Sequence, residues 1–228
     1  KMNLKIIQAG IDSTSSRESK SILQLKSLGE RYIRIENDPY EEEPPLEKIY
    51  KGRKDMYVGK DKDFNTFGFT PRHYGAFLSH KQSIMLGFAD KGHSLICEAD
   101  CKIFDLEIFK KRLQEASNIL DKTDYPIVRF EPSNKSKYSI PTIFGKQVSK
   151  NIFECDQIIL GHCYLINEKS KLFFENLYNN VGWHTPDWWL VHAFQEYNQK
   201  MLGFKEKLTH QFSGFSEIDK IMQLNEER

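Results

Sequence analysis

An apolar run in the middle of the chain ends in two carboxylates that are separated by one residue. Residues 94–99 read Ser-Leu-Ile-Cys-Glu-Ala, and Asp100 follows. Successive side chains of a strand alternate between faces, so Glu98 and Asp100 are expected on one face and Ala99 on the other. Two carboxylates suit Mg²⁺ or Mn²⁺, which also bind phosphate oxygens. We therefore predict a metal site at Glu98 and Asp100, with a solvated acidic turn as the alternative.

A divalent ion needs more than two ligands, and histidine is a common further one. The sequence does not rank the histidines that could serve. The candidates for a third ligand are His162, His184, His192 and His210.

The elements expected around these residues alternate between strands and helices, which favours an α/β domain with a mostly parallel sheet and helices on both faces. Residues 4–9 predict the first strand, and the apolar spacing from Ile22 predicts the helix after it. Thr70 and Pro71 predict the start of a long helix, because threonine caps helices and proline fits their first turn. The expected strands cover residues 4–9, 32–35, 94–99, 126–131 and 157–166, and the expected helices cover residues 17–28, 71–90, 105–121, 169–178 and from 186 onward.

The remaining segments predict connections within a single domain of residues 1–228. Residues 38–68 mix charges and prolines, which indicates a mobile loop that a ligand orders. Residues 138–153 surround Gly145 and predict a hairpin over the site. The charged tail from residue 215 is expected to be peripheral.

Charge and cysteine usage exclude several classes of protein. A net charge of +1, from 33 basic and 32 acidic residues, gives no strong field toward nucleic acid. No apolar stretch reaches the length of a transmembrane helix, and the start lacks the apolar core of a signal peptide. The cysteines show no metal-binding spacing, so we expect free, buried thiols in a reducing compartment. They are Cys97, Cys101, Cys155 and Cys163.

Several segments, in this order, resemble glycosyltransferase family 25, which includes lipooligosaccharide-type sugar transferases and collagen galactosyltransferases. Residues 75–80 (Gly-Ala-Phe-Leu-Ser-His) are similar to the family's Gly-x-x-x-Ser-His helix. Residues 95–100 are similar to its apolar strand ending in Glu-Asp-Asp. Residues 161–166, followed by Thr-Pro-Asp at 185–187, are similar to its later strand and Pro-x-Asp element, and Arg17 fits its opening.

The resemblance implies a GT-A-like fold, a nucleotide-diphosphate sugar donor and inversion at the anomeric carbon. It also implies a Mn²⁺ or Mg²⁺ ion on Glu98 and Asp100. The chain departs from the family at Ala99, where the family usually has an aspartate. One possible carboxylate ligand is therefore absent.

An inverting transfer needs a base for the acceptor hydroxyl, and Asp187 in the Pro-x-Asp element is the candidate. The alternative is that Asp187 only stabilises the positive end of its helix, with Thr185 as the cap. Trp188 and Trp189 are candidates for a platform that binds the acceptor sugar, with burial in the core as the alternative.

Donor binding is expected where the first strand opens into a loop, because open α/β sheets bind ligands outside the carboxyl ends of their strands. Ala9, Gly10 and Asp12 lie there, and Arg17 could pair with a phosphate. His80 is expected to position donor phosphates or the acidic strand, with a satisfied core histidine as the alternative.

The sequence therefore predicts a metal-assisted hexosyltransferase that uses UDP-galactose or UDP-glucose, with an acceptor that is a glycan or a lipid-linked saccharide. Lipopolysaccharide or other glycan biosynthesis is the expected context. We expect a soluble, cytoplasmic location, with peripheral contact to a membrane left open. The alternatives are a nucleotide-sugar hydrolase and a sugar-nucleotide or glycan-binding protein with little activity.

Overall fold

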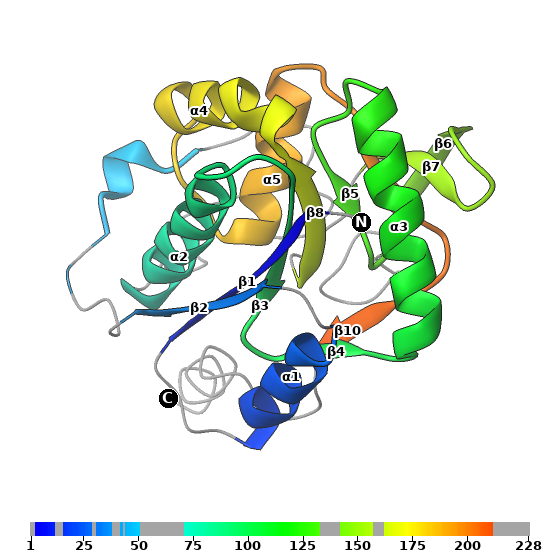
Figure 1. Ribbon diagram of the computed structural model, residues 1–228. Coiled ribbons are helices and arrows are strands. Elements are labelled where there is room, and N and C mark those ends of the chain that lie inside the picture. The colour runs from blue at the N-terminus through cyan, green and yellow to red at the C-terminus, as the bar shows by residue number, and fades with distance from the viewer. Residues whose placement is uncertain are drawn as a thin grey trace, which may run out of the picture.

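A central sheet of eight strands runs through the computed structural model, with helices packed on it (Figure 1). The structure describes residues 3–11, 16–28, 31–37, 42, 44–50, 71–132, 142–156 and 162–211. The strand order is β2-β1-β3-β8-β5-β9-β7-β6. The bounds are β1 Leu4–Ile11, β2 Arg31–Asn37, β3 His93–Glu98, β5 Val128–Arg129, β6 Ile143–Gln147, β7 Ile152–Asp156, β8 Cys163–Asn167 and β9 Met201–Phe204.

The sheet is mixed, but most of its strands point the same way. β1 pairs in parallel with β2 and β3, and β5 pairs in parallel with β9. β8 is antiparallel to both of its neighbours, as is β7. β7 and β8 therefore run against the other strands of this sheet, and the prediction of a mostly parallel α/β sheet is confirmed.

Helices cover both faces of the sheet, as predicted. Figure 1 shows α2, α4 and α5 grouped on one side and α3 on the other. The helices are α1 Ser16–Lys26, α2 Pro71–Gly87, α3 Leu106–Lys122, α4 Lys171–Asn180 and α5 Pro186–Glu196, with short 3-10 turns at η1 Leu46–Lys48 and η4 Glu168–Ser170.

Alternation along the central strands builds one apolar core on each face. Ile96 of β3 and Ile166 of β8 bury into the core that includes α2, α4 and α5. Their neighbours Leu95 and Leu165 bury into the core that includes α1 and α3. Successive side chains of a strand point to opposite faces, so a continuous apolar run places apolar residues on both faces of the sheet. Such strands are therefore buried on both sides.

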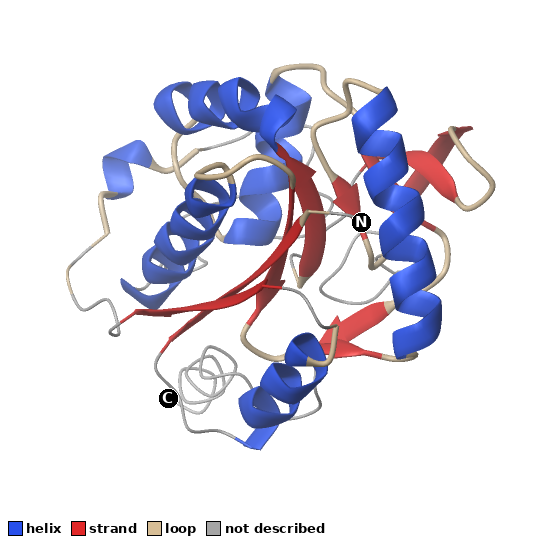
Figure 2. Cartoon of the chain, in the orientation of Figure 1, coloured by secondary structure: helices blue, strands red, loops and turns tan. Residues whose placement is uncertain are grey.

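A small two-stranded sheet lies beyond the end of β3 (Figure 2). It pairs β4 Cys101–Ile103 with β10 Thr209–Gln211 in antiparallel fashion. Gln24 of α1 holds β4 by two hydrogen bonds: its Nε2 donates to the Ile103 carbonyl at 3.0 Å, and its Oε1 accepts from the Ile103 N–H at 2.9 Å. α1 thus fixes the segment that follows the acidic motif.

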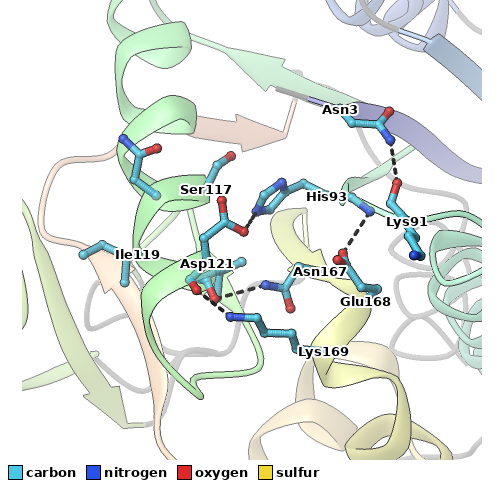
Figure 3. Close-up of polar contacts among 12 residues, drawn as sticks. Asn3, Lys91, His93, Ser117, Ile119, Asp121, Asn167, Glu168 and Lys169 are labelled. Atoms are coloured by element: carbon cyan, nitrogen blue, oxygen red, sulfur yellow. Dashed lines mark hydrogen bonds and ion pairs between the residues drawn. The ribbon is translucent and has the colours of Figure 1, made fainter. Parts of the chain in front are cut away.

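The opposite end of β3 is fixed by a separate polar cluster (Figure 3). His93 Nε2 lies 3.1 Å from Asp121 Oδ1 at the end of α3. Asn167 donates its side-chain amide to the Leu120 carbonyl at 3.1 Å, and Lys169 donates to the Asp121 carbonyl. These contacts join β3, β8 and α3, so the two strands that reach the candidate site are anchored at their far ends.

The predicted helices and most predicted strands are present, with boundaries shifted by a few residues. Of the strand predicted over 157–166, the end is present as β8, which begins at Cys163, and residues 157–161 lie outside the described residues. The hairpin exists as β6 and β7, but it forms the far edge of the sheet, separated from β8 by β5 and β9. Three short strands were not predicted: β4, β9 and β10. The loop of 38–68 and the tail from 215 lie mostly outside the described residues.

All four cysteines are free and buried, as predicted. Within the described part of the chain, no helix is both long and apolar enough to span a membrane.

Candidate active site

Two strand ends meet at the centre of the sheet and bring Glu98 and His162 together. Glu98 is the last residue of β3, and His162 immediately precedes β8. Because β8 is antiparallel to β3, its beginning lies at the edge where β3 ends. The Glu98 N–H donates to the His162 carbonyl at 2.9 Å. This edge is also where the carboxyl end of β1 lies, since Ala9 pairs with Glu98.

Asp100 joins this pair through a turn. One possible ligand atom from each of Glu98, Asp100 and His162 lies within 4.8 Å of the others. The prediction that one extended strand would carry both carboxylates was wrong, because β3 ends at Glu98 and a turn follows it. Gln8 of β1 supports this turn by donating Nε2 to the Ala99 carbonyl at 2.8 Å. The turn still places both acidic side chains in one group.

Glu98 and His162 stabilise each other's charged forms. His162 donates from Nδ1 to the Glu98 carboxylate. Burial disfavours the charged imidazolium, but the Glu98 carboxylate outweighs burial and raises the pKa of His162 to about 10. Burial likewise opposes ionisation of Glu98, yet His162 and His80 hold its pKa well below the ordinary range.

His80 of α2 lies on the other side of Glu98. Its Nε2 is 3.5 Å from Glu98 Oε1, and its Nδ1 is 3.0 Å from the Tyr164 hydroxyl. These contacts hold the ring between β8 and the end of β3. That His80 positions the acidic strand stays a prediction.

A second group of possible ligands shares His162 with the first. Glu131, just after β5, forms it with His162 and His210, whose ligand atoms lie within 4.8 Å of one another. His210 Nδ1 lies 2.7 Å from Glu131 Oε1, and Lys207 Nζ lies 3.4 Å from the same oxygen. Among the described residues, Glu131 Oε2 is buried without a hydrogen-bond partner. Of the candidate third ligands, His162 and His210 therefore lie at the site.

Asp187 faces the same charges from α5. It lies in the first turn after Thr185 and Pro186, as predicted. Within the described chain, its Oδ1 is shielded from solvent and has no hydrogen-bond partner. Burial, and then the Glu98 carboxylate, raise the pKa of Asp187 to about 6, while His162 and Arg129 act in the opposite direction.

Arg129 is the largest charged group buried at this edge. It ends β5, is 1% exposed, and lies with its guanidinium carbon 5.9 Å from the centre of the Tyr164 ring. Nε and both terminal nitrogens of Arg129 lack a hydrogen-bond partner in the described part of the protein. Burial lowers its pKa, whereas nearby Asp187 and Glu98 raise it.

The comparisons with known proteins do not identify a family. No protein-family model and no curated protein sequence matches the chain. A solved structure described as a glycosyltransferase involved in the glycosylation of the major capsid of PBCV-1 is similar, with a TM-score of 0.49 and 10% identity over 97% of this chain and 98% of that chain. A likeness of this size carries no argument about activity. The resemblance to family 25 stays a prediction.

The two tryptophans have different environments. Trp189 is 2% exposed, stacks on Tyr178 and donates Nε1 to the Gly182 carbonyl at 2.7 Å. These contacts favour the core alternative for Trp189. Trp188 is only partly buried and stacks on His192. The acceptor platform therefore stays a prediction for Trp188.

His184 and His192 belong to this aromatic cluster, and the metal-ligand groups of the described residues do not include them. Burial lowers the pKa of His184 to about 3 and that of His192 to about 4. Their rings are therefore neutral near pH 7.

The predicted donor-binding residues are only partly described. Ala9 is buried next to Glu98 in the sheet, and the backbone of Gly10 continues β1. Asp12 lies outside the described residues, and for Arg17 only the helical backbone is described.

Sequence reasoning missed Arg129 and Glu131, although the chain carries a signal for both. Residues 127–131 read Ile-Val-Arg-Phe-Glu, so two charges alternate with apolar residues in a predicted strand. Charged residues are almost never fully buried without a partner. A strand that alternates charges with core residues therefore indicates a polar site on one face.

Proposed function

We propose that the chain is a metal-assisted glycosyltransferase that moves a hexose from a nucleotide-diphosphate sugar to a saccharide acceptor with inversion. The observation that carries this proposal is the position of Asp187. A shielded carboxylate without a hydrogen bond in the described chain lies within electrostatic reach of a carboxylate–histidine group suited to a metal. Such a transfer needs a base for the acceptor hydroxyl and stabilisation of the leaving diphosphate, which a bound metal can supply.

The donor atoms fit Mn²⁺ or Mg²⁺. Glu98 and Asp100 offer carboxylate oxygens, which both ions prefer. His162 would add an imidazole nitrogen, which favours the transition metal of the two, once a bound cation displaces the proton that Glu98 stabilises on the ring. A cation held there would stabilise the negative charge of the departing diphosphate.

Asp187 has the properties of a general base for the acceptor hydroxyl. Catalytic efficiency is highest when the pKa of a base lies near the working pH, and the pKa of about 6 lies far closer to neutrality than that of an ordinary aspartate. Its free Oδ1 is available to accept a proton, because no hydrogen bond from the described residues occupies that atom. The resemblance to family 25 and its UDP-hexose donors points to UDP-galactose or UDP-glucose.

The test is to measure UDP release from UDP-galactose and UDP-glucose, with and without Mn²⁺ and with and without a panel of saccharide acceptors. Metal-dependent release that requires an acceptor supports the proposal. Equal release without any acceptor indicates a hydrolase. Binding of the donor, seen as a rise in melting temperature without turnover, indicates a sugar-nucleotide-binding protein.

A further inference from the structure

A buried arginine without a hydrogen bond is the feature of this site that the proposed chemistry leaves unexplained. Arg129 can donate five N–H bonds, and its nitrogens make none with the described residues. A buried charge without a partner is strongly destabilising, so such groups are rare unless a ligand completes them.

The protein holds the Arg129 side chain in place without using its donors. Tyr164 of β8 lies beneath the guanidinium. The face of its aromatic ring attracts the cation. The tyrosine hydroxyl is already engaged with His80 Nδ1 at 3.0 Å. The described residues therefore leave the five N–H groups of Arg129 without a partner, on a cation that Tyr164 helps to hold in place.

Carboxylates surround Arg129 but do not neutralise it. Asp187, Glu98 and Glu131 are all near enough to raise its pKa, yet none forms an ion pair with it in the described part of the chain. Glu98 is engaged by His162, and one oxygen of Glu131 by His210. Asp187 Oδ1 has no hydrogen-bond partner among the described residues, but it forms no ion pair with Arg129 either.

We propose that Arg129 binds an oxyanion of the donor. This inference rests on the proposed function. Guanidinium groups match phosphate and carboxylate oxygens in a planar, two-pronged geometry. The oxyanion has two possible sources, the diphosphate of the donor or a carboxylate on the transferred sugar.

The substitution Arg129→Met separates this binding role from a structural one. Replacing a buried, unpaired charge with an apolar side chain of similar volume is neutral or stabilising. The melting temperature of the free protein should therefore stay the same or rise. A structural arginine would instead lower it. Arg129→Lys keeps the charge without the planar fork and should restore part of the binding.

A matched control is Arg112→Met on α3. Arg112 is paired with Glu206 at 3.1 Å and with Glu115 at 3.7 Å, on the outer face of the protein. Its replacement should leave ligand affinity unchanged, which shows that removing an arginine does not by itself alter binding.

The experiment measures the affinity of wild type and variants, with Mn²⁺, for UDP, UDP-glucose and UDP-glucuronate. Loss of a charge-assisted hydrogen bond should weaken binding by about 10- to 100-fold. An equal loss for all three ligands assigns Arg129 to the diphosphate. A loss confined to UDP-glucuronate assigns it to a sugar carboxylate.

Two outcomes overturn the inference, and they differ in what they say about the proposed function. If wild type binds the nucleotides and Arg129→Met binds them equally well, Arg129 has no such role and the proposed function stands. If wild type with Mn²⁺ binds none of the three, the proposed function fails and the inference falls with it.

Discussion

Glu98 and His162 face each other across the ends of two antiparallel strands, and the imidazole donates a hydrogen bond to the carboxylate. The two residues are 64 positions apart in the chain. The backbone hydrogen bond between them and the pairing of Cys97 with Cys163 one step inward fix their separation. The carboxylate and the imidazole are therefore positioned by the sheet before any ligand binds.

We expect Asp100→Asn and Glu98→Gln each to weaken Mn²⁺-dependent binding of UDP at least tenfold, because each removes a charged oxygen ligand. The measurement is the rise in melting temperature with UDP and Mn²⁺. Glu107→Gln is the control, since Glu107 is exposed on α3 and pairs with Lys110 of the same helix. An unchanged response to Mn²⁺ in both site variants would remove the metal assignment.

Replacing Asp187 with Asn should lower kcat by about 10²- to 10⁴-fold, which is the usual contribution of a general base. Donor binding should change little, because the substitution leaves the metal ligands intact. Glu196→Gln, at the other end of the same helix, is the control. Near-normal turnover with a lowered melting temperature would show that Asp187 only stabilises the helix start.

The pH dependence of kcat in the wild-type protein should follow the ionisation of Asp187. Burial raises the pKa of Asp187 to about 6, and the base is active only when deprotonated. The value of kcat should therefore rise as the pH increases through about 6 and become constant above it. A flat profile between pH 5 and 7 would contradict this role.

The free energy of unfolding should fall, whereas kcat rises, as the pH increases toward about 6. The pKa of Asp187 is above its ordinary value of 3.8, so the folded state holds the proton where the unfolded state has lost it. Stability therefore falls as the pH rises from about 4 to about 6. The melting temperature of Asp187→Asn relative to wild type should increase over that interval and then level off.

Replacement by alanine should have different effects on stability and on acceptor binding at Trp188 and at Trp189. Trp189→Ala should cost about 3–5 kcal/mol of unfolding free energy, because it empties a packed core position. Trp188→Ala should cost less, since that ring is only partly buried, and should raise the KM for the saccharide acceptor. Chemical denaturation measures the first effect and acceptor kinetics the second. Equal loss of stability and an unchanged KM would place Trp188 in the core as well.

The parts of the fold that could be predicted are those with a local signal. The apolar periodicity of residues 106–120 and the cap at Asp105 define α3, and Asp105 accepts from the Ile108 N–H at 2.9 Å as a cap should. The sequences of the short strands β4, β9 and β10 show no comparable periodicity of apolar residues. They form because partners distant in sequence supply their hydrogen bonds.

The candidate site could be predicted where its residues lie close together in the chain, or where they stand in a segment of the family resemblance, as His80 and Asp187 do. Glu98 and Asp100 could be proposed together because they stand in one motif, and the structure places them in one group of possible ligands. The choice of His162 among the histidines depends on the reversed direction of β8, which an apolar strand does not reveal in its sequence. Arg129 enters the site through a third strand, so its role depends on the strand order.

The reversed direction of β8 also determines which changes in chain length the site can tolerate. Tyr164 and Cys163 lie in the cores on opposite faces of the sheet. Because side chains alternate along a strand, His162, just before β8, is expected on the side of Tyr164. Inserting or deleting one residue within β8 would move the imidazole to the cysteine side, because a strand repeats every two residues. A two-residue change would keep the face but shift the ring by about 7 Å along the strand. We therefore expect that changes of chain length inside β8 would disrupt the site.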